Sequence, residues 1–214
     1  MVTKYTALQE EIRTIAGDRE VTIVAVSKYA NIEETQLLYK AGLRHFGESK
    51  VQALEKKQEA LPYPDITWHF IGHVQSNKLR RLITSNALIQ SVDRRPLLQA
   101  LVEEAEKTQT ERSILLQVKI TDEPTKQGFS PLDILQLPQT LFWGKIKIQG
   151  LMVMGPNTDH PGDIQKVFHQ AKVLYEQLKT MYTSIDTLSM GMSHDYPIAL
   201  KEGATQLRLG QYFL

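Results

Sequence analysis

The stretch Val21-Thr-Ile-Val-Ala-Val-Ser-Lys28 carries the pattern that decides the fold. It is a short apolar run, rich in β-branched residues, and such runs are typical of strands buried in a parallel sheet. Similar runs recur along the whole chain, and several of them end at a glycine. We predict eight strands, over residues 22–27, 44–47, 67–71, 87–91, 113–119, 146–152, 186–190 and 206–210.

The segments between these strands have the spacing of amphipathic helices. From Ile164 to Met181, apolar residues recur at i, i+3, i+4 and i+7, which places them on one helix face. Asp93 is a plausible N-cap for the helix that follows it, and Pro96 fits the first turn of that helix. The predicted helices cover residues 94–107, 162–182 and a segment from near Pro131 to near Pro138.

Regular alternation of strands and helices indicates a parallel sheet covered by helices, an α/β fold. An open doubly wound sheet usually has about five or six strands, so eight units favour a closed (β/α)₈ TIM barrel. The open sheet is the alternative. Only four residues follow the eighth predicted strand, so we expect no outer helix after it. A helix near the N-terminus, with apolar residues from Tyr5 to Ile15 on one face, is predicted to fill that place.

Composition excludes several classes of function. The chain has 214 residues, a formal net charge of +1 and a hydrophobic fraction of 42%, and it lacks cysteine. We expect one domain over residues 1–214, with no basic field for nucleic acid and no membrane span. The absence of cysteine excludes a disulfide framework, a cysteine nucleophile and a thiolate metal site. With no signal or transit peptide recognised, a cytoplasmic protein is expected.

Polar residues gather at the predicted strand ends, which form the active-site face of such a barrel. Lys28 directly follows the first strand and would project into the barrel mouth, unless it is a surface lysine with its amine in water. The last two strands run into glycine-containing loops, Leu188-Ser-Met-Gly-Met-Ser-His-Asp195 and Gln206-Leu-Arg-Leu-Gly-Gln211. The loops after strands seven and eight are the usual phosphate site of these barrels.

Arg208 lies within the eighth predicted strand. Alternation would direct Leu207 and Leu209 to the helices and Arg208 into the barrel. A buried guanidinium keeps its proton and must be paired. Its partner is either Glu48, in a structural ion pair, or a ligand.

A strand-end lysine that faces a phosphate pocket favours Schiff-base chemistry with a phosphorylated carbonyl compound. Two chemistries fit: a sugar-phosphate aldolase of the lysine type, or pyridoxal phosphate held as an internal aldimine. No metal site is expected. His69 and His73 have helical spacing, but they lie on a predicted strand and turn.

A series of ordered motifs points to one family. They are Val26-Ser-Lys28, Phe46-Gly-Glu48, His69-Phe-Ile-Gly-His-Val-Gln-Ser-Asn-Lys78, Gln90-Ser-Val-Asp93, Gly150-Leu-Met152, Leu188-Ser-Met-Gly-Met-Ser193 and Arg208-Leu-Gly210. Together they resemble the pyridoxal phosphate homeostasis proteins, also called the proline synthase co-transcribed homologue family. The resemblance implies the fold-type III barrel of the alanine racemase N-terminal domain, without that enzyme's C-terminal β domain.

The resemblance also implies roles for individual residues. Lys28 matches the lysine that forms the aldimine, and Arg208 matches the arginine that faces the pyridine nitrogen. A permanently charged arginine disfavours a proton on that nitrogen, which makes the cofactor a poorer electron sink. The cofactor-binding set implied is Lys28, Ser49, Met192, Ser193, Arg208, Gly210 and Gln211, with Ser193 and the Gly210–Gln211 backbone at the phosphate.

Two of these positions depart from the family pattern. Many members have asparagine where this chain has Ser49, and a small hydroxyl residue where it has Gln211. Each departure removes one expected side-chain contact to the cofactor. Lys78 is expected to be an exposed lysine near a helix start, and the alternative is a second place where pyridoxal phosphate or its phosphate group visits.

Function follows from what racemisation would require. Racemisation needs acid/base groups on both faces of the α-carbon, and the second base of alanine racemase comes from the domain that is missing. We therefore expect a non-catalytic, monomeric protein of vitamin B6 and amino-acid homeostasis, which holds pyridoxal phosphate on Lys28 and delivers it to amines or apo-enzymes. A weak amino-acid racemase and a Schiff-base aldolase are the alternatives.

Overall fold

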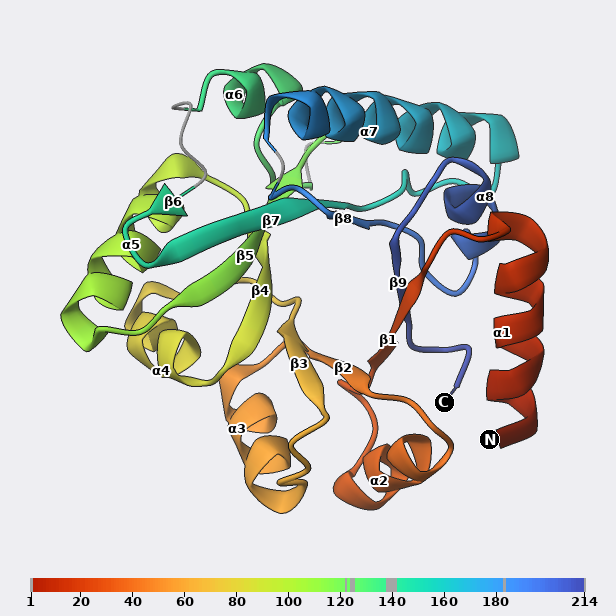
Figure 1. The fold of residues 1–214 in the computed structure, drawn as a ribbon, viewed down its shortest axis with the longest axis horizontal. Helices are drawn as coiled ribbons and strands as arrows, with labels where there is room; N and C mark the ends of the chain where they lie inside the picture. Colours follow the sequence, from red (N-terminus) through yellow and green to blue (C-terminus); the bar gives the residue numbers. More distant parts are fainter. Residues whose placement is uncertain (1, 122, 124–125, 138–141, 183, 214) are drawn as a thin grey trace.

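The computed structural model describes the chain except for residues 1, 122, 124–125, 138–141, 183 and 214. One sheet runs in the order β5-β4-β3-β2-β1-β9-β8-β7-β6, and β5 also pairs with β7, so that eight parallel strands close into a barrel (Figure 1). The barrel strands are β1 (Thr22–Val26), β2 (His45–Glu48), β3 (Thr67–Phe70), β4 (Ala87–Val92), β5 (Arg112–Val118), β7 (Ile146–Val153), β8 (Thr187–Ser189) and β9 (Gln206–Leu209). The predicted closed barrel is confirmed.

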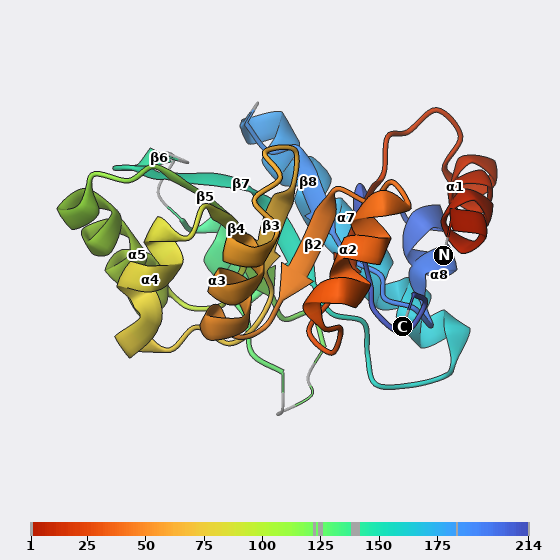
Figure 2. The same cartoon turned by 90° about the horizontal axis from the view of Figure 1, so that it is seen from below.

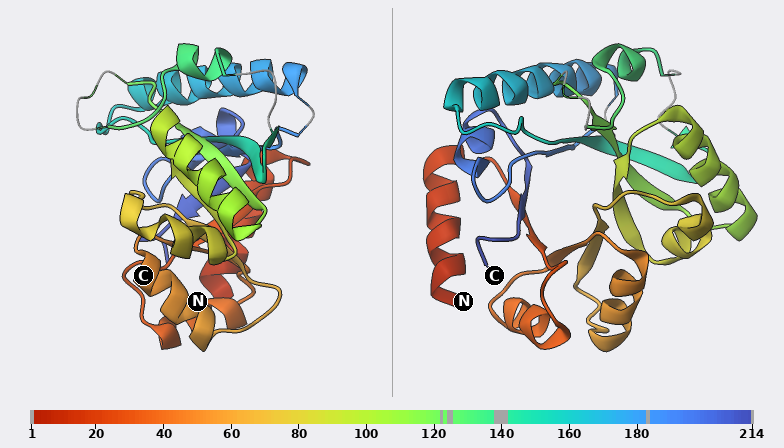
Figure 3. Two further views of the ribbon diagram at one scale, coloured as in Figure 1. Left: turned by 90° about the vertical axis from the view of Figure 1, so that its left-hand side faces the viewer. Right: turned by 180° about the vertical axis from the view of Figure 1, so that it is seen from behind.

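Helices surround the ring of strands (Figures 2 and 3). They are α1 (Val2–Ala16), α2 (Ile32–Lys40), α3 (Val51–Ala60), the 3₁₀ turn η1 (Ser76–Lys78), α4 (Leu79–Thr84), α5 (Arg95–Thr108), α6 (Pro131–Leu135), α7 (Pro161–Met181) and α8 (Tyr196–Lys201). Helix α1 packs against α8, where Tyr196 Oη donates a hydrogen bond of 2.8 Å to Glu11. The predicted N-terminal helix therefore completes the outer layer.

The bounds of each predicted strand differ from the observed bounds by at most two residues. The agreement arises because β-branched runs are typical of strands that are covered by helices. Strand β6 (Phe142–Trp143) was not predicted. It pairs antiparallel with the start of β7, outside the ring. Among the described residues, none of the helices combines the length and apolarity needed to cross a bilayer.

The prediction of Asp93 as an N-cap was wrong. Helix α5 begins at Arg95, and its N-cap is Arg94, which makes no side-chain capping bond. The carboxylate of Asp93 instead accepts a hydrogen bond of 2.5 Å from Arg94 Nη1. Helix α6 ends at Leu135, and its predicted end at Pro138 lies outside the described residues.

The core consists mainly of outward-facing strand residues packed under the helices. Phe46 of β2 and Trp68 of β3 are buried there with ring centroids 5.7 Å apart. Next to β7 and α8, α7 contributes a row of buried residues from Ile164 to Leu178. Each fully buried side chain of this kind contributes about 1.5–3 kcal/mol. This shell leaves the inward-facing positions of the strands free for polar residues.

Candidate functional site

A cavity of about 620 Å³ opens at the carboxyl ends of the strands. Six of the seven residues predicted at the site line it: Lys28, Met192, Ser193, Arg208, Gly210 and Gln211. They come from the ends of β1, β9 and β8, which are neighbours in the sheet although β1 is far from the other two strands in sequence. The structure therefore brings the lysine and both glycine-containing loops to one cavity, as predicted.

Lys28 is exposed in the turn that follows β1. Its Nζ lies 4.8 Å from the ring centroid of Tyr29, whose side chain is 83% exposed. The turn is closed by a hydrogen bond of 2.9 Å from the Ala30 amide to the Ser27 carbonyl. An amine in this position can be reached both by a molecule in the cavity and by one arriving from solvent.

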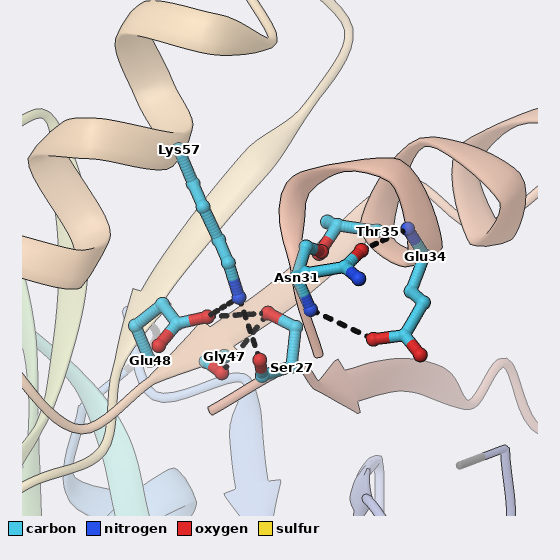
Figure 4. Close-up of polar contacts among 7 residues, drawn as sticks. All are labelled: Ser27, Asn31, Glu34, Thr35, Gly47, Glu48 and Lys57. Carbon is cyan, nitrogen blue, oxygen red and sulfur yellow. Dashed lines mark hydrogen bonds and ion pairs between the residues drawn. The ribbon is translucent and has the colours of Figure 1, made fainter. Parts of the chain in front are cut away.

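A buried cluster fixes the strand end just before Lys28 (Figure 4). Lys57 of α3 donates two hydrogen bonds, one of 2.5 Å to the Glu48 carboxylate and one of 2.6 Å to the Ser27 carbonyl. The Ser27 hydroxyl donates a third, of 2.7 Å, to the same carboxylate. All three side chains are almost fully buried. The cluster therefore holds the ends of β1 and β2 together.

The start of α2 fixes the other side of the same turn. The backbone amide of Glu34 donates a hydrogen bond of 2.8 Å to the Asn31 side chain, and the backbone amide of Asn31 donates one of 2.7 Å to the Glu34 carboxylate (Figure 4). This reciprocal pair is a capping box, which satisfies two backbone donors at the helix start. Lys28 thus stands on a short turn that is anchored at both ends.

Arg208 points into the barrel, as the alternation of β9 predicts, while Leu207 and Leu209 are buried in the outer core. The guanidinium donates a hydrogen bond of 2.7 Å from Nη1 to Ser189 Oγ, and another of 2.9 Å from Nη2 to the Val153 carbonyl. Burial lowers the pKa of Arg208 to about 10, although the Asp195 carboxylate favours the charged form. Arg208 is still a cation at neutral pH.

Glu48 as an ion-pair partner of Arg208 was wrong. The side chain of Glu48 points outward from the barrel and is held by Lys57. The inward-facing position next to it in β2 is Gly47, where a Cβ would lie 3.2 Å from Val24 Cγ1. Arg208 instead meets a hydroxyl and a carbonyl, which leaves its charge without a bonded carboxylate among the described residues.

The loops after β8 and β9 present a set of hydrogen-bond donors. Ser193 Oγ accepts a hydrogen bond of 3.1 Å from the Tyr212 amide, and this bond holds the two loops together. Because the hydroxyl acts as an acceptor here, its own hydrogen is still available to a ligand. Within the described part of the chain, the backbone amides of Ser193, His194 and Gln211 donate to no protein acceptor. A hydroxyl and free amides at one cavity are the donor set of a phosphate site.

Gly191 lets the first loop approach the barrel closely. Its φ is +94°, and a Cβ there would lie 2.6 Å from Ala199 Cβ and 2.9 Å from Leu207 Cδ2. Only glycine fits this conformation and this space. The loop is further fixed by the buried Asp195, whose Oδ1 accepts 2.5 Å from the Met192 amide.

Ser49 is the predicted site residue that the structure places elsewhere. It lines a second cavity of about 220 Å³, together with His73 and Lys78. The backbone of Ser49 packs so closely on Gly72 that a Cβ at Gly72 would lie 2.0 Å from the Ser49 carbonyl oxygen. This packing turns the chain from β2 into α3 and away from the larger cavity.

Sequence reasoning missed the apolar wall of the larger cavity, which is formed by Ile71, Met152 and Met154. The signal was present, since Met152 and Met154 are two positions apart at a strand end and share a face. It also missed Ser189, whose contact with Arg208 depends on how two strands pair. Groups of three or more potential metal ligands are absent from the described residues.

Comparison with known proteins identifies the family. A family model described as the N-terminal domain of alanine racemase matches residues 4–213. A pyridoxal phosphate homeostasis protein from Synechocystis is 40% identical over 193 residues, which cover 89% of this chain and 88% of the relative. Its counterpart from Aquifex aeolicus is 36% identical over 196 residues, or 91% and 86% of the two chains. This chain belongs to the pyridoxal phosphate homeostasis protein family.

Solved structures agree with this assignment. PipY of Synechococcus elongatus, without pyridoxal phosphate, superposes with a TM-score of 0.90 at 34% identity, over 100% of this chain and 99% of that one. PipY with pyridoxal phosphate bound gives 0.87, over 99% and 98%. Alanine racemase of Clostridium difficile, at 15% identity, matches with 0.74 over 96% of this chain and 54% of its own, which shows the shared fold. The family resemblance predicted from the motifs is confirmed.

Proposed function

We propose that this pyridoxal phosphate homeostasis family member is a single cofactor-binding domain, residues 1–214, that holds pyridoxal 5'-phosphate reversibly and hands it on without turning over a substrate. The observation that carries the proposal is the cavity at the carboxyl ends of the strands. It combines one accessible primary amine, a set of phosphate donors and a buried cation. A related protein, PipY, has a structure with pyridoxal phosphate bound.

The residues present fit the cofactor. Ser193 and the free amides of its loop and of Gln211 supply neutral hydrogen-bond donors, which the oxygens of a phosphate dianion accept. Arg208, buried and without a bonded carboxylate, suits an acceptor such as a pyridine nitrogen. When bound, pyridoxal phosphate supplies an aldehyde that condenses reversibly with a primary amine. Lys28 offers such an amine.

Release and delivery are supported by exposure. Lys28 and Tyr29 lie at the open side of the cavity, so an incoming amine from an amino acid or an apo-enzyme can approach Lys28 directly. Tyr29 stands beside the Lys28 amine rather than across the cavity from it, as the 4.8 Å contact between them indicates. A second proton-transfer group on the opposite face is what racemisation would need. We infer that one chain suffices and that the role is that of a carrier.

The test is the absorbance of purified protein after addition of pyridoxal phosphate. A band near ~420 nm reports a lysine-linked cofactor, and it should be lost in Lys28→Ala. Lys40→Ala, which removes an exposed lysine at the far end of α2, should keep the band. A colourless wild type would reject the cofactor and favour the aldolase alternative.

Catalysis is tested separately. Incubation of the loaded protein with alanine in D₂O should leave the α-hydrogen in place over many hours. Exchange that depends on Lys28 would reject the carrier role and support a weak racemase.

A further inference from the structure

A row of hydrogen-bonded side chains crosses the interior of the barrel and ends at Arg208. From Arg208 Nη1 it passes to Ser189 Oγ at 2.7 Å, to Gln90 Oε1 at 2.7 Å, from Gln90 Nε2 to His69 Nδ1 at 2.8 Å, and from His69 Nε2 to His45 Nδ1 at 3.0 Å. The residues belong to β9, β8, β4, β3 and β2. Strands β4 and β8 are not paired, so the Gln90–Ser189 bond spans the barrel.

The direction of this row is set at Arg208. A guanidinium can only donate, so Ser189 Oγ accepts from it and keeps one hydrogen to give. That hydrogen goes to Gln90 Oε1, which turns the amide nitrogen of Gln90 toward His69. The opposite orientation of the amide would leave the Ser189 hydrogen without an acceptor in a buried place.

The orientation of Gln90 fixes the tautomer of His69, because the Gln90 amide nitrogen can only donate and His69 Nδ1 must therefore accept. Its only ring hydrogen is then on Nε2, where it donates to His45 Nδ1. Burial, together with the nearby His45, lowers the pKa of His69 to about 3, so the ring is neutral at physiological pH. A protonated ring would carry a hydrogen on both nitrogens and could not accept from Gln90.

The central members of the row have no solvent to replace these bonds. Gln90 and Ser189 are 0% exposed, and His69 is 1% exposed. In such surroundings a lost partner is costly, and hydrogen bonds in a chain reinforce one another. The orientation of each side chain is therefore tied to that of the next.

We propose that Ser189, Gln90 and His69 are positioning residues, which act in one direction to fix the Arg208 guanidinium at the cavity. Val153 holds Nη2 from β7, and the row holds Nη1 from the barrel interior, so the guanidinium plane cannot turn. The relevance of the row to pyridoxal phosphate rests on the proposed function. The positioning itself is a property of the protein alone.

The first experiment uses the protein without cofactor. In wild type, nitrogen-15 NMR should resolve the separate Nη groups of Arg208, because rotation about its Cζ–Nε bond is slow. In Ser189→Ala these signals should merge, because the rate of rotation about the Cζ–Nε bond should rise at least tenfold. Ser91→Ala is the matched control, since Ser91 is a buried serine that donates to the Gly72 carbonyl and lies outside the row. Equal rotation in wild type and Ser189→Ala would overturn the proposal.

A second variant tests the direction of the row. Gln90→Glu can still accept from Ser189 but cannot donate to His69. Arg208 should therefore stay fixed, while the His69 hydrogen moves from Nε2 to Nδ1, which nitrogen-15 shifts of the imidazole report directly. A wild-type hydrogen on Nδ1, or a mobile Arg208 in Gln90→Glu, would contradict the one-directional row.

Loaded protein provides the link to function. Ser189→Ala should still form the band near ~420 nm but release pyridoxal phosphate about tenfold faster than wild type and Ser91→Ala. Unchanged release would restrict the row to a structural role and overturn its bearing on the cofactor. If wild type shows no band while Arg208 is immobile only with Ser189 present, the proposed function fails and the positioning row stands.

Discussion

Lys57 Nζ lies 2.5 Å from Glu48 Oε1, and the two side chains are buried together directly beneath the turn that carries Lys28. Neither residue lines the large cavity. Their pairing nevertheless holds the ends of β1 and β2 together, and Lys28 lies in the turn that follows β1. The pair links the stability of the barrel to the geometry of the proposed site.

Lys57→Met should destabilise the fold strongly, because it leaves the Glu48 carboxylate buried without its cation. Breaking a buried pair in this way costs about 3–5 kcal/mol, measured as the free energy of unfolding in urea. In the double variant Lys57→Met, Glu48→Leu, the remaining charge is gone, so about 2 kcal/mol or more should return. Losses that simply add in the double variant would show that the pairing does not matter.

Ser193→Ala should weaken pyridoxal phosphate binding roughly 10- to 100-fold, because a hydrogen bond to a charged group contributes about 1.5–3 kcal/mol. The comparison ligand is pyridoxal, which has the aldehyde but no phosphate. With pyridoxal, wild type and Ser193→Ala should bind alike by absorbance titration. An equal loss for both ligands would place Ser193 away from the phosphate.

Gly191→Ala should damage both stability and binding, because it adds a Cβ at a φ of +94° and 2.6 Å from Ala199. Gly17→Ala is the control, with a φ of +62° and nothing within 4 Å of the new Cβ. The backbone strain alone costs about 1–2 kcal/mol, and overpacking at Gly191 adds about 1–3 kcal/mol. Thermal unfolding should separate the two variants, and equal losses would argue against close packing at Gly191.

Acid should destabilise the protein through His69. Its pKa in the folded state is about 3, below its ordinary value of 6.5, because burial and nearby His45 oppose the charge. Above pH 6.5 the ring is neutral in both states and has no effect. Between pH 6.5 and 3 the unfolded state binds a proton that the folded state does not, so stability falls by up to ~1.4 kcal/mol per pH unit.

The control for this pH dependence is His69→Gln. Carboxylates whose pKa is lowered, such as that of Glu176, also lose stability in acid, and both proteins share that contribution. The difference between wild type and His69→Gln should therefore isolate His69. Parallel pH profiles over this range would mean that His69 is protonated at its ordinary pKa in the folded protein.

Much of the fold follows from local sequence. The run from Thr22 to Val26 is a strand because β-branched residues suit a position covered by helices, and eight such runs favour a closed barrel over an open sheet. Alternation also gave the inward direction of Arg208. Its partner was beyond reach, since Ser189 meets Arg208 only through the pairing of β8 with β9, and Gln90 is 99 positions away from Ser189.

The failures have the same physical origin. Ser49 follows a strand end as Lys28 does, but its backbone packs on Gly72 and turns it to another cavity. Strand β6 has only two residues, which is too short for a periodic pattern to predict it, and it pairs antiparallel with the start of β7. Contacts between distant segments decide these details.

The pairing of β1 with β9 also bears on how the protein matures as it is synthesised. Lys28 follows the first strand and Arg208 lies in the last, and Ala25 pairs with Leu209 beside them. Until β9 has left the ribosome, β1 has an open edge that is free to pair with other chains. The cavity exists only after that edge is closed. Capture of an aldehyde cofactor would therefore mark a chain that has finished folding, and a nascent or truncated chain would have no place for it.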